Sequence, residues 1–144
     1  MITTYKTITT PTQAEFKDKG SRFIAYAYPI RTLADVKKYL DPLKEEHHKA
    51  RHWCYAYRLG VDGMQFRAGR PILGQIDSVG VTDVLVVVVR YFGGTLLGVP
   101  GLIHAYKEST AQALAIAEVV EKNVEKTVWL KCEYPVLNEA IWIA

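Results

Sequence analysis

The chain has 144 residues, of which 49% are hydrophobic and 23% are charged. These proportions are typical of a folded globular domain and argue against a disordered chain. The longest apolar run, Val84–Val89, is far shorter than the roughly 20 residues that a membrane helix needs, and the start of the sequence does not have the pattern of a signal peptide. The chain has only two cysteines, so we expect a fold that does not depend on disulfides, in a cytoplasmic protein without membrane contact.

The charge of the chain is unevenly distributed. The formal net charge is +3. Residues 108–144 hold six glutamates and three lysines and so carry a net charge of −3, which leaves a net charge of +6 on residues 1–107. A basic surface of this kind suits an anionic partner, although it can also be a solvated surface that binds nothing.

The first third of the chain predicts two strands and a helix. Residues 2–9 are rich in β-branched side chains, and residues 21–30 form an aromatic-rich run that Pro29 should stop. Thr32, with Asp35 three positions later, predicts the start of a helix, which Pro42 should end or kink.

Residues 52–59 alternate in polarity as a strand with one buried and one polar face does. We expect the polar face to be open to a ligand. The residues on the predicted core side are Trp53, Tyr55, Tyr57 and Leu59, and those on the predicted polar side are His52, Cys54, Ala56 and Arg58.

The second half predicts a buried strand between two helices. Residues 60–71 read as a loop and residues 72–79 as a short helix. Val84–Val89 does not alternate, so both of its faces should be covered, as in the central strand of a sheet. A helix should run from 102 to about 120, and a strand from 128 to 132 should end before Pro135. This order of elements predicts an α+β or α/β domain with one sheet.

A possible anion site follows the buried strand. Arg90 ends the strand, and a guanidinium there must reach solvent, a carboxylate or an anionic ligand. Tyr91 and Phe92 come next and can stack on bases or belong to the core. The glycines that follow can expose backbone N–H groups to an anion at a helix start, or they can simply allow a tight turn. These glycines are Gly93, Gly94, Gly98 and Gly101.

The segment around residue 50 contains possible metal ligands and a possible nucleophile. Zinc requires three or four ligands at compatible spacing, and we expect no metal and no other cofactor here. His52 and Cys54 lie on one strand face, but their spacing of about 6.6 Å is long for a thiol–imidazole pair. An inert cysteine is the competing interpretation. The potential ligands are His47, His48, His52 and Cys54.

Basic residues alternate with aromatic ones in three stretches, which is the mixture that RNA-binding surfaces use. These stretches contain Lys17, Lys19, Arg22 and Phe23; then Lys49, Arg51, Arg58, Trp53 and Tyr57; then Arg67, Arg70, Arg90 and Tyr91.

Several of these segments together resemble a known family. In chain order they are "KGSRFIAYAYPI", "HHKARHWCYAYRLG", "AGRPILGQI", "GVTDVLVVVVRYFGGTLLGVPGLIHAY" and "KESTAQAL". They are similar to the IMPACT N-terminal family, in its bacterial YigZ and YvyE type, over residues 1–125. Residues 126–144 resemble the start of the small ferredoxin-like domain that bacterial members carry next, with most of that domain absent.

The resemblance implies a two-layer α+β sandwich, with a four-stranded sheet and helices on one face. This fold is similar to domain IV of elongation factor G and to the second domain of a small-subunit ribosomal protein. The family usually carries "DGEPSGTAG" where this chain has "DGMQFRAG" at residues 62–69, so the loop here is one residue shorter. The matching positions are Ser21, Arg22, Phe23, His52, Cys54, Tyr55, Gly69, Pro71, Arg90 to Gly94, Gly98 and Gly101.

The resemblance also implies a role in translation control, because eukaryotic members restrain a kinase of an initiation factor. We expect a non-catalytic regulatory module that binds RNA, the ribosome or a translation-associated protein. The alternative is a hydrolase-type enzyme that uses His52, Cys54 and the Gly93–Gly101 loop. The candidate ligand residues are Ser21, Arg22, His52, Cys54, Arg58, Arg70, Arg90, Tyr91, Gly93, Gly94, Gly98 and Gly101.

Overall fold

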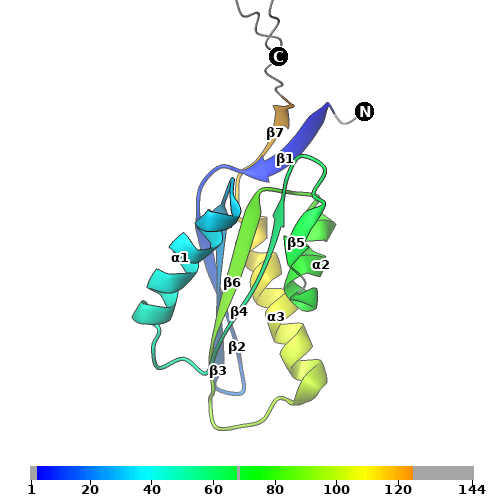
Figure 1. The fold of residues 1–144 in the computed structure, drawn as a ribbon. Helices are drawn as coiled ribbons and strands as arrows, with labels where there is room; N and C mark the ends of the chain where they lie inside the picture. The colour runs from blue at the N-terminus through cyan, green and yellow to red at the C-terminus, as the bar shows by residue number, and fades with distance from the viewer. Residues whose placement is uncertain (1–2, 68, 125–144) are drawn as a thin grey trace, which may run out of the picture.

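The computed structural model describes residues 3–67 and 69–124, which form an α+β fold (Figure 1). Three helices and seven strands lie within these residues. The elements are β1 (Thr4–Ile8), β2 (Thr12–Asp18), β3 (Ser21–Pro29), α1 (Leu33–Glu46), β4 (His52–Leu59), β5 (Gln65–Arg67), α2 (Arg70–Val79), β6 (Val84–Tyr91), α3 (Gly98–Ala115) and β7 (Val119–Asn123).

The strands form a large sheet and a small ribbon. The large sheet has five strands in the order β2-β3-β6-β4-β5, and every neighbouring pair is antiparallel. The ribbon consists of β1 and β7, also antiparallel, and it stands at one end of the large sheet (Figure 1). The order of elements predicted a single sheet, and the resemblance implied that it has four strands. The large sheet has five strands, of which β2 and β5 were not predicted, and the predicted first strand, β1, lies in the ribbon instead. The short β5 lies in the predicted loop at 60–71 and pairs with the end of β4.

Strand β6 is the central strand, as its unbroken apolar run predicted. All six residues from Val84 to Val89 have no exposed surface. Val84, Val86 and Val88 pack on the side of α2 and α3, whereas Leu85, Val87 and Val89 pack on the side of α1. Burial of each such side chain contributes about 1.5–3 kcal/mol relative to exposure, so this strand anchors both halves of the core.

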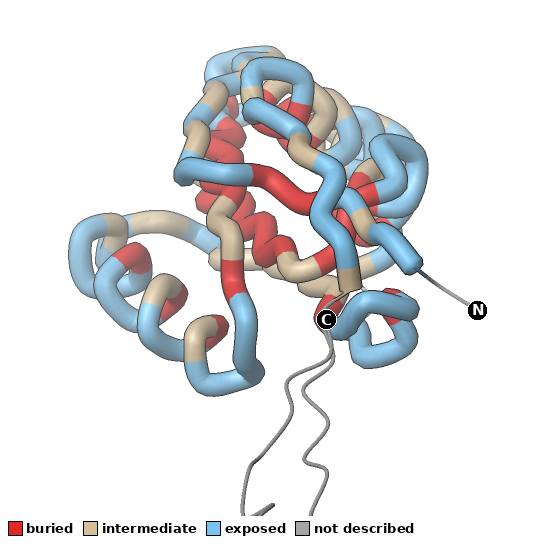
Figure 2. Tube along the Cα trace, turned by 90° about the horizontal axis from the view of Figure 1, so that it is seen from above, coloured by how far each residue is buried: buried red, intermediate tan, exposed pale blue. Residues whose placement is uncertain are grey.

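Helices cover both faces of the sheet, which corrects the expectation of two layers with all helices on one face. Helix α1 buries Val36, Leu40 and Leu43 against one face. Helices α2 and α3 cover the other face, on which Ile76 and Ala113 are fully buried. Figure 2 shows the buried residues in the interior, with exposed residues around them. A strand that is apolar at every position requires cover on both sides, because either face would otherwise be exposed to water.

Helix α1 begins where the sequence predicted and continues past its proline. Thr32 is the N-cap, and the Asp35 carboxylate accepts hydrogen bonds from the N–H groups of Arg31 and Thr32. Pro42 lies inside the helix, which ends only at Glu46. Leu43 is buried directly after the proline, so packing on the sheet holds the last turn in helical form against the proline's local preference.

Helix α3 is shorter at its end than predicted, because β7 begins where the helix was expected to continue. The helix stops at Ala115, and the N–H of Thr9 bonds the carbonyl of Glu118 at 3.1 Å as β7 joins β1. Pairing with a strand more than 100 residues earlier in the chain is not visible in local periodicity.

The predicted polar face of β4 is also corrected. Ala56 on that face is fully buried against α2 and α3, and Cys54 packs beside it. The opposite face, predicted to be core, holds three half-buried aromatic side chains that pack on the α1 side, namely Trp53, Tyr55 and Tyr57.

Two further expectations concern residues outside those described. The predicted strand at 128–132 and the second domain at 126–144 both fall there. Among residues 3–67 and 69–124, no helix is long and apolar enough to cross a membrane.

Candidate functional site

Three chain segments bring basic residues to one end of the large sheet. The turn between β2 and β3, the start of β4 and the end of β6 meet there, at the lower end in Figure 1. Arg22 is the register partner of Tyr91, and His52 is the partner of Arg90. The N–H of Arg51 also bonds the carbonyl of Arg90 at 2.8 Å. We call this region the basic end, and its cations are Lys17, Lys19, Arg22, Lys49, Arg51 and Arg90.

Arg90 is half-buried and lacks a carboxylate partner among the described residues. It lies on the α3 side of the sheet, since its register partner Phe23 is in that part of the core. Its Nε atom is buried without a hydrogen-bond partner, and neither ion pair of the described residues includes it. A guanidinium in this position gains from a water or an anion that reaches it.

A small hollow lies beside Arg90, and none of the described residues in its wall is acidic. Its volume is about 170 Å³, and the residues around it are Arg51, His52, Arg90, Phe92 and Leu96. The guanidinium carbon of Arg51 lies 4.8 Å from the centre of the Phe92 ring, so this cation is stacked on an aromatic surface. Two arginines around one hollow favour an anion there.

Arg22 and Tyr91 form the other part of the basic end, on the α1 face. The guanidinium of Arg22 pairs with Glu15 and lies 5.4 Å from the centre of the Tyr91 ring. The Tyr91 hydroxyl is 2.6 Å from Nδ1 of His47, and Nε2 of the same imidazole is 2.8 Å from the hydroxyl of Tyr26. The hydrogen bond to His47 therefore fixes the ring of Tyr91 in place, and the guanidinium of Arg22 lies over that ring.

Cys54 contacts a tyrosine of α3. Its thiol donates a hydrogen bond of 3.3 Å to the hydroxyl of Tyr106. Burial raises the pKa of Tyr106, and the bond with Cys54 raises it further, while the charge of Arg90 acts in the opposite direction. No hydrogen bond joins Cys54 to His52 in the part of the chain that the structure describes. The thiol–imidazole pair that the enzyme hypothesis requires is therefore not formed here.

Two of the predicted site residues, Ser21 at the start of β3 and Gly93 in the turn after β6, have a structural role. The hydroxyl of Ser21 is fully buried and accepts a hydrogen bond of 3.0 Å from the N–H of Gly93. A Cβ atom at Gly93 would lie 2.1 Å from the carbonyl carbon of Gly20, so only glycine fits. Both residues hold β6 against the β2–β3 turn.

The remaining glycines of this loop differ from Gly93. Gly94 and Gly98 have positive φ angles of +89° and +73°, and both are exposed. Gly101 lies in the first turn of α3, close to the side chain of Leu97. The positive φ angles explain why glycine occupies positions 94 and 98 without any ligand.

Arg58 is not part of the basic end, which corrects its grouping with Arg90. Arg58 pairs with Val84 at the other end of β6, about six residues or roughly 20 Å from the level of Arg90. It forms an ion pair of 2.6 Å with Asp77 and donates to the carbonyl of Gly63, so it joins β4 to α2 and to a turn. Arg70 is the exposed first residue of α2.

The candidate list from the sequence omitted Arg51, Phe92, Leu96 and Tyr106. The sequence did show Arg51 in a basic and aromatic stretch, but its position beside Arg90 depends on the register of β4 against β6. Among the described residues, no group of three or more His, Cys, Asp or Glu side chains could hold a metal ion.

Comparison with known proteins gives relatives over most of the chain. An IMPACT family member of Haemophilus influenzae is 37% identical over 81% of this chain. The IMPACT family member YigZ of Escherichia coli is 35% identical, also over 81% of this chain. The matched regions cover 62% and 63% of these two relatives, so the chain spans less than two thirds of their length.

A solved structure has the same fold. The crystal structure of a hypothetical protein superposes with a TM-score of 0.81 and is 31% identical, covering 85% of this chain and 66% of that one. The family model for the Impact N-terminal domain matches residues 19–114. On this match and the identities above, the chain belongs to the IMPACT family.

Proposed function

We propose that this chain is a translation-associated binding module of the cytoplasm that binds single-stranded RNA at its basic end. Membership in the IMPACT family supports the association with translation, in line with the role that the resemblance implied for eukaryotic members. The choice of RNA rests on the chemistry of the basic end, which combines exposed cations with fixed aromatic rings.

The observation that carries the proposal is the half-buried guanidinium of Arg90 beside a hollow whose described wall residues include no acid. A phosphate in this hollow would face Arg51 and Arg90 together. Arginine binds phosphate with two parallel N–H groups, which makes it effective where charge and direction both matter. An RNA phosphate would give Arg90 the anionic partner that it lacks among the described residues.

Two arginines that lie on aromatic rings favour the binding of RNA bases next to this phosphate. Arg51 covers Phe92 at the hollow beside Arg90, and Arg22 covers Tyr91 on the α1 face at the same end of the sheet. Bases stack on guanidinium planes and on aromatic rings, and stacking on an aromatic ring contributes about 1–3 kcal/mol of binding free energy for each base. A strand of RNA that passes over this end would meet both stacks and the exposed lysines Lys17, Lys19 and Lys49.

The proposal is tested with fluorescence anisotropy of a labelled single-stranded RNA of about 12 nucleotides. Affinity should fall steeply between about 50 and 200 mM salt, because cations are released from the RNA on binding. Arg51→Gln and Arg90→Gln should each weaken binding and reduce the salt slope by about 0.7, the value for one phosphate contact on a single strand.

Lys37→Gln is the matched control, since it removes one positive charge from an exposed position on α1, away from the basic end. It should leave RNA affinity unchanged. Circular dichroism checks that each variant is folded, and exposed Arg51 gives a variant that does not disturb the core. A flat salt dependence, or equal affinity for the wild type and Arg51→Gln, would contradict RNA binding and favour a protein partner instead.

A further inference from the structure

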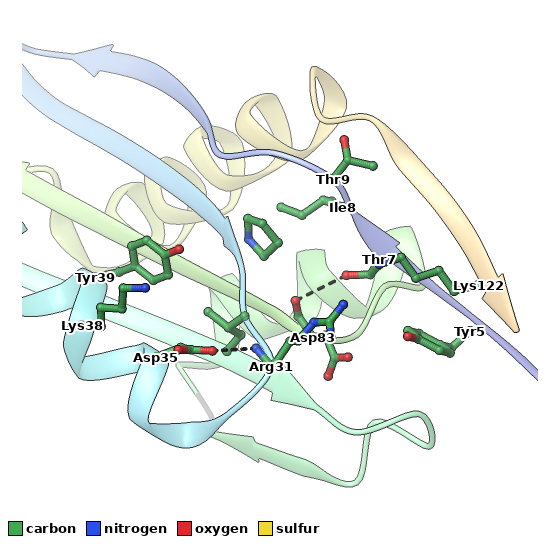
Figure 3. A pocket seen from close by; sticks show the side chains of 12 residues that line it. Tyr5, Thr7, Ile8, Thr9, Arg31, Asp35, Lys38, Tyr39, Asp83 and Lys122 are labelled. Atoms are coloured by element: carbon green, nitrogen blue, oxygen red, sulfur yellow. Dashed lines mark hydrogen bonds between the residues drawn. The ribbon is translucent and has the colours of Figure 1, made fainter. Parts of the chain in front are cut away.

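A cavity of about 380 Å³ lies at the end of the sheet opposite the basic end (Figure 3). One wall is the first turns of α1, with Asp35, Lys38 and Tyr39, and the other is the β1–β7 ribbon. Arg31 lies between the two walls in Figure 3. This volume is in the lower part of the range for pockets that hold small organic ligands.

Three cations from three separate segments surround this cavity. Arg31 precedes α1, Lys38 is on α1 and Lys122 is on β7. None of them belongs to an ion pair of the described residues. Cations that converge on one concave surface repel one another, and a bound anion relieves that repulsion.

The two carboxylates in the wall are already engaged by backbone N–H groups. Asp35 accepts from Arg31 at 2.9 Å and from Thr32 at 3.1 Å, and these bonds lower its pKa, so it is ionised at neutral pH. Asp83 accepts from the N–H of Gly60 at 3.0 Å. These bonds engage one oxygen of each carboxylate, and the charge of Lys38 also acts on Asp35. The three cations of the wall still exceed its two carboxylates by one positive charge.

The cavity also offers aromatic surface. Tyr39 lines the α1 wall, and its ring stacks on that of Tyr28 with centres 4.3 Å apart and planes 13° apart. Tyr5 lines the ribbon wall. The ammonium of Lys38 lies over the Tyr39 ring, 5.6 Å from its centre, so the α1 wall presents a cation and an aromatic ring side by side. Such a wall suits a ligand that joins an aromatic ring to an anion.

We propose that this cavity binds a nucleoside monophosphate. The phosphate lies among Arg31, Lys38 and Lys122, and the base packs on the tyrosine of the α1 wall or on that of the ribbon. The site is separate from the basic end and does not depend on RNA binding there.

Isothermal titration calorimetry tests this site with AMP, GMP, CMP and UMP as ligands, and with inorganic phosphate and adenosine as partial probes. At least one nucleotide should bind with a dissociation constant below about 1 mM. Lys38→Gln and Lys122→Gln should each weaken that binding about tenfold, which is the scale of one charge-assisted hydrogen bond. Phosphate and adenosine alone should bind more weakly than the nucleotide.

The matched control is Lys37→Gln, which removes the same charge one position away, at a residue that does not line the cavity. It should bind the nucleotide as the wild type does. RNA affinity, measured by anisotropy on Lys38→Gln, should also be unchanged. If none of the four nucleotides binds, or if Lys37→Gln weakens binding as much as Lys38→Gln, the proposal is wrong. If phosphate alone binds as tightly as the nucleotide, the tyrosines take no part and the assignment to a nucleotide is overturned.

Discussion

The backbone N–H of Gly93 donates a hydrogen bond of 3.0 Å to the hydroxyl oxygen of Ser21, a side chain with no exposed surface. This bond joins the segment after β6 to the first residue of β3. It also brings the backbones of Gly20 and Gly93 into direct contact. The turn that supports the basic end is therefore held by a close backbone contact that leaves no room for a side chain.

Gly93→Ala should destabilise the protein strongly. The new Cβ would lie 2.1 Å from the carbonyl carbon and 2.4 Å from the carbonyl oxygen of Gly20, so the backbone must separate. We expect a loss of about 3 kcal/mol or more in the free energy of unfolding, measured by urea titration with circular dichroism.

Gly94→Ala is the matched control, because it changes the neighbouring glycine where a Cβ meets no atom within 4 Å. Its φ of +89° costs a non-glycine residue about 1 kcal/mol. Equal losses in the two variants would contradict the close contact as the reason for glycine at position 93.

Asp77→Asn should destabilise the protein modestly. The ion pair of Asp77 with Arg58 is partly exposed, with 48% and 20% of the two side chains accessible, so solvent screens it. The Nε atom of Arg58 is buried without a partner, which increases the cost of losing the carboxylate. We expect a loss of about 1 kcal/mol in urea titrations, reduced by added salt. Asp41→Asn, at an exposed residue of α1 outside both ion pairs, should have little effect, and an equal loss there would contradict the role of the Arg58 pair.

Stability should fall between pH 10 and pH 12, in part because of Tyr28. Burial raises the pKa of Tyr28 from 10.0 to about 12 in the folded protein. Below pH 10 both states keep the proton, so the contribution of this group is complete. Above pH 10 the unfolded chain loses the proton first, so the free energy of unfolding decreases as the pH rises through the folded pKa.

Urea titrations at pH 9 and pH 11 measure this effect. Tyr28→Phe cannot ionise at this position, so its stability should fall less between the two pH values than that of the wild type. A fall of the same size in both proteins would show that Tyr28 does not contribute to it.

The Cys54 thiol should react slowly in the folded protein. It is half-buried, packs beside the core and donates to the hydroxyl of Tyr106. In a Cys132→Ser background, modification by a thiol reagent should be much slower in buffer than in urea, and Tyr106→Phe should accelerate it. A folded protein that reacts faster than the unfolded chain would instead support the enzyme hypothesis, because it would indicate an activated thiolate.

Local pattern was sufficient where one element's own residues decide its conformation. The alternation at His52–Leu59 predicted β4 with the correct bounds, and the unbroken run at Val84–Val89 predicted a central strand covered on both faces. Thr32 and Asp35 predicted the start of α1. In each case the signal is the period of burial or the chemistry of a cap, and both are properties of adjacent residues.

The local sequence pattern gave wrong predictions where pairing or packing with a distant segment determines the structure of a residue. Helix α3 ends at Ala115 because residues 119–123 pair with β1, and α1 continues past Pro42 because Leu43 is buried on the sheet. The polar positions of β4 indicated an open face, yet α2 and α3 cover it. Tertiary packing overrides weak local preferences in all three cases.

The mixture of helices and strands, the central strand and the position of Arg90 at its end follow from the residue pattern alone, and the resemblance adds the α+β class and the family. The tertiary structure was needed to identify which cations share a site, because strand register places Arg90 beside Arg51 and His52 and places Arg58 at the far end with Asp77. It also decided that Gly93 serves the contact with Gly20, and that Arg31, Lys38 and Lys122 surround one cavity. The reason is physical: periodicity reports which side of an element is buried, whereas the neighbours of a side chain depend on pairing and packing between segments far apart in the chain.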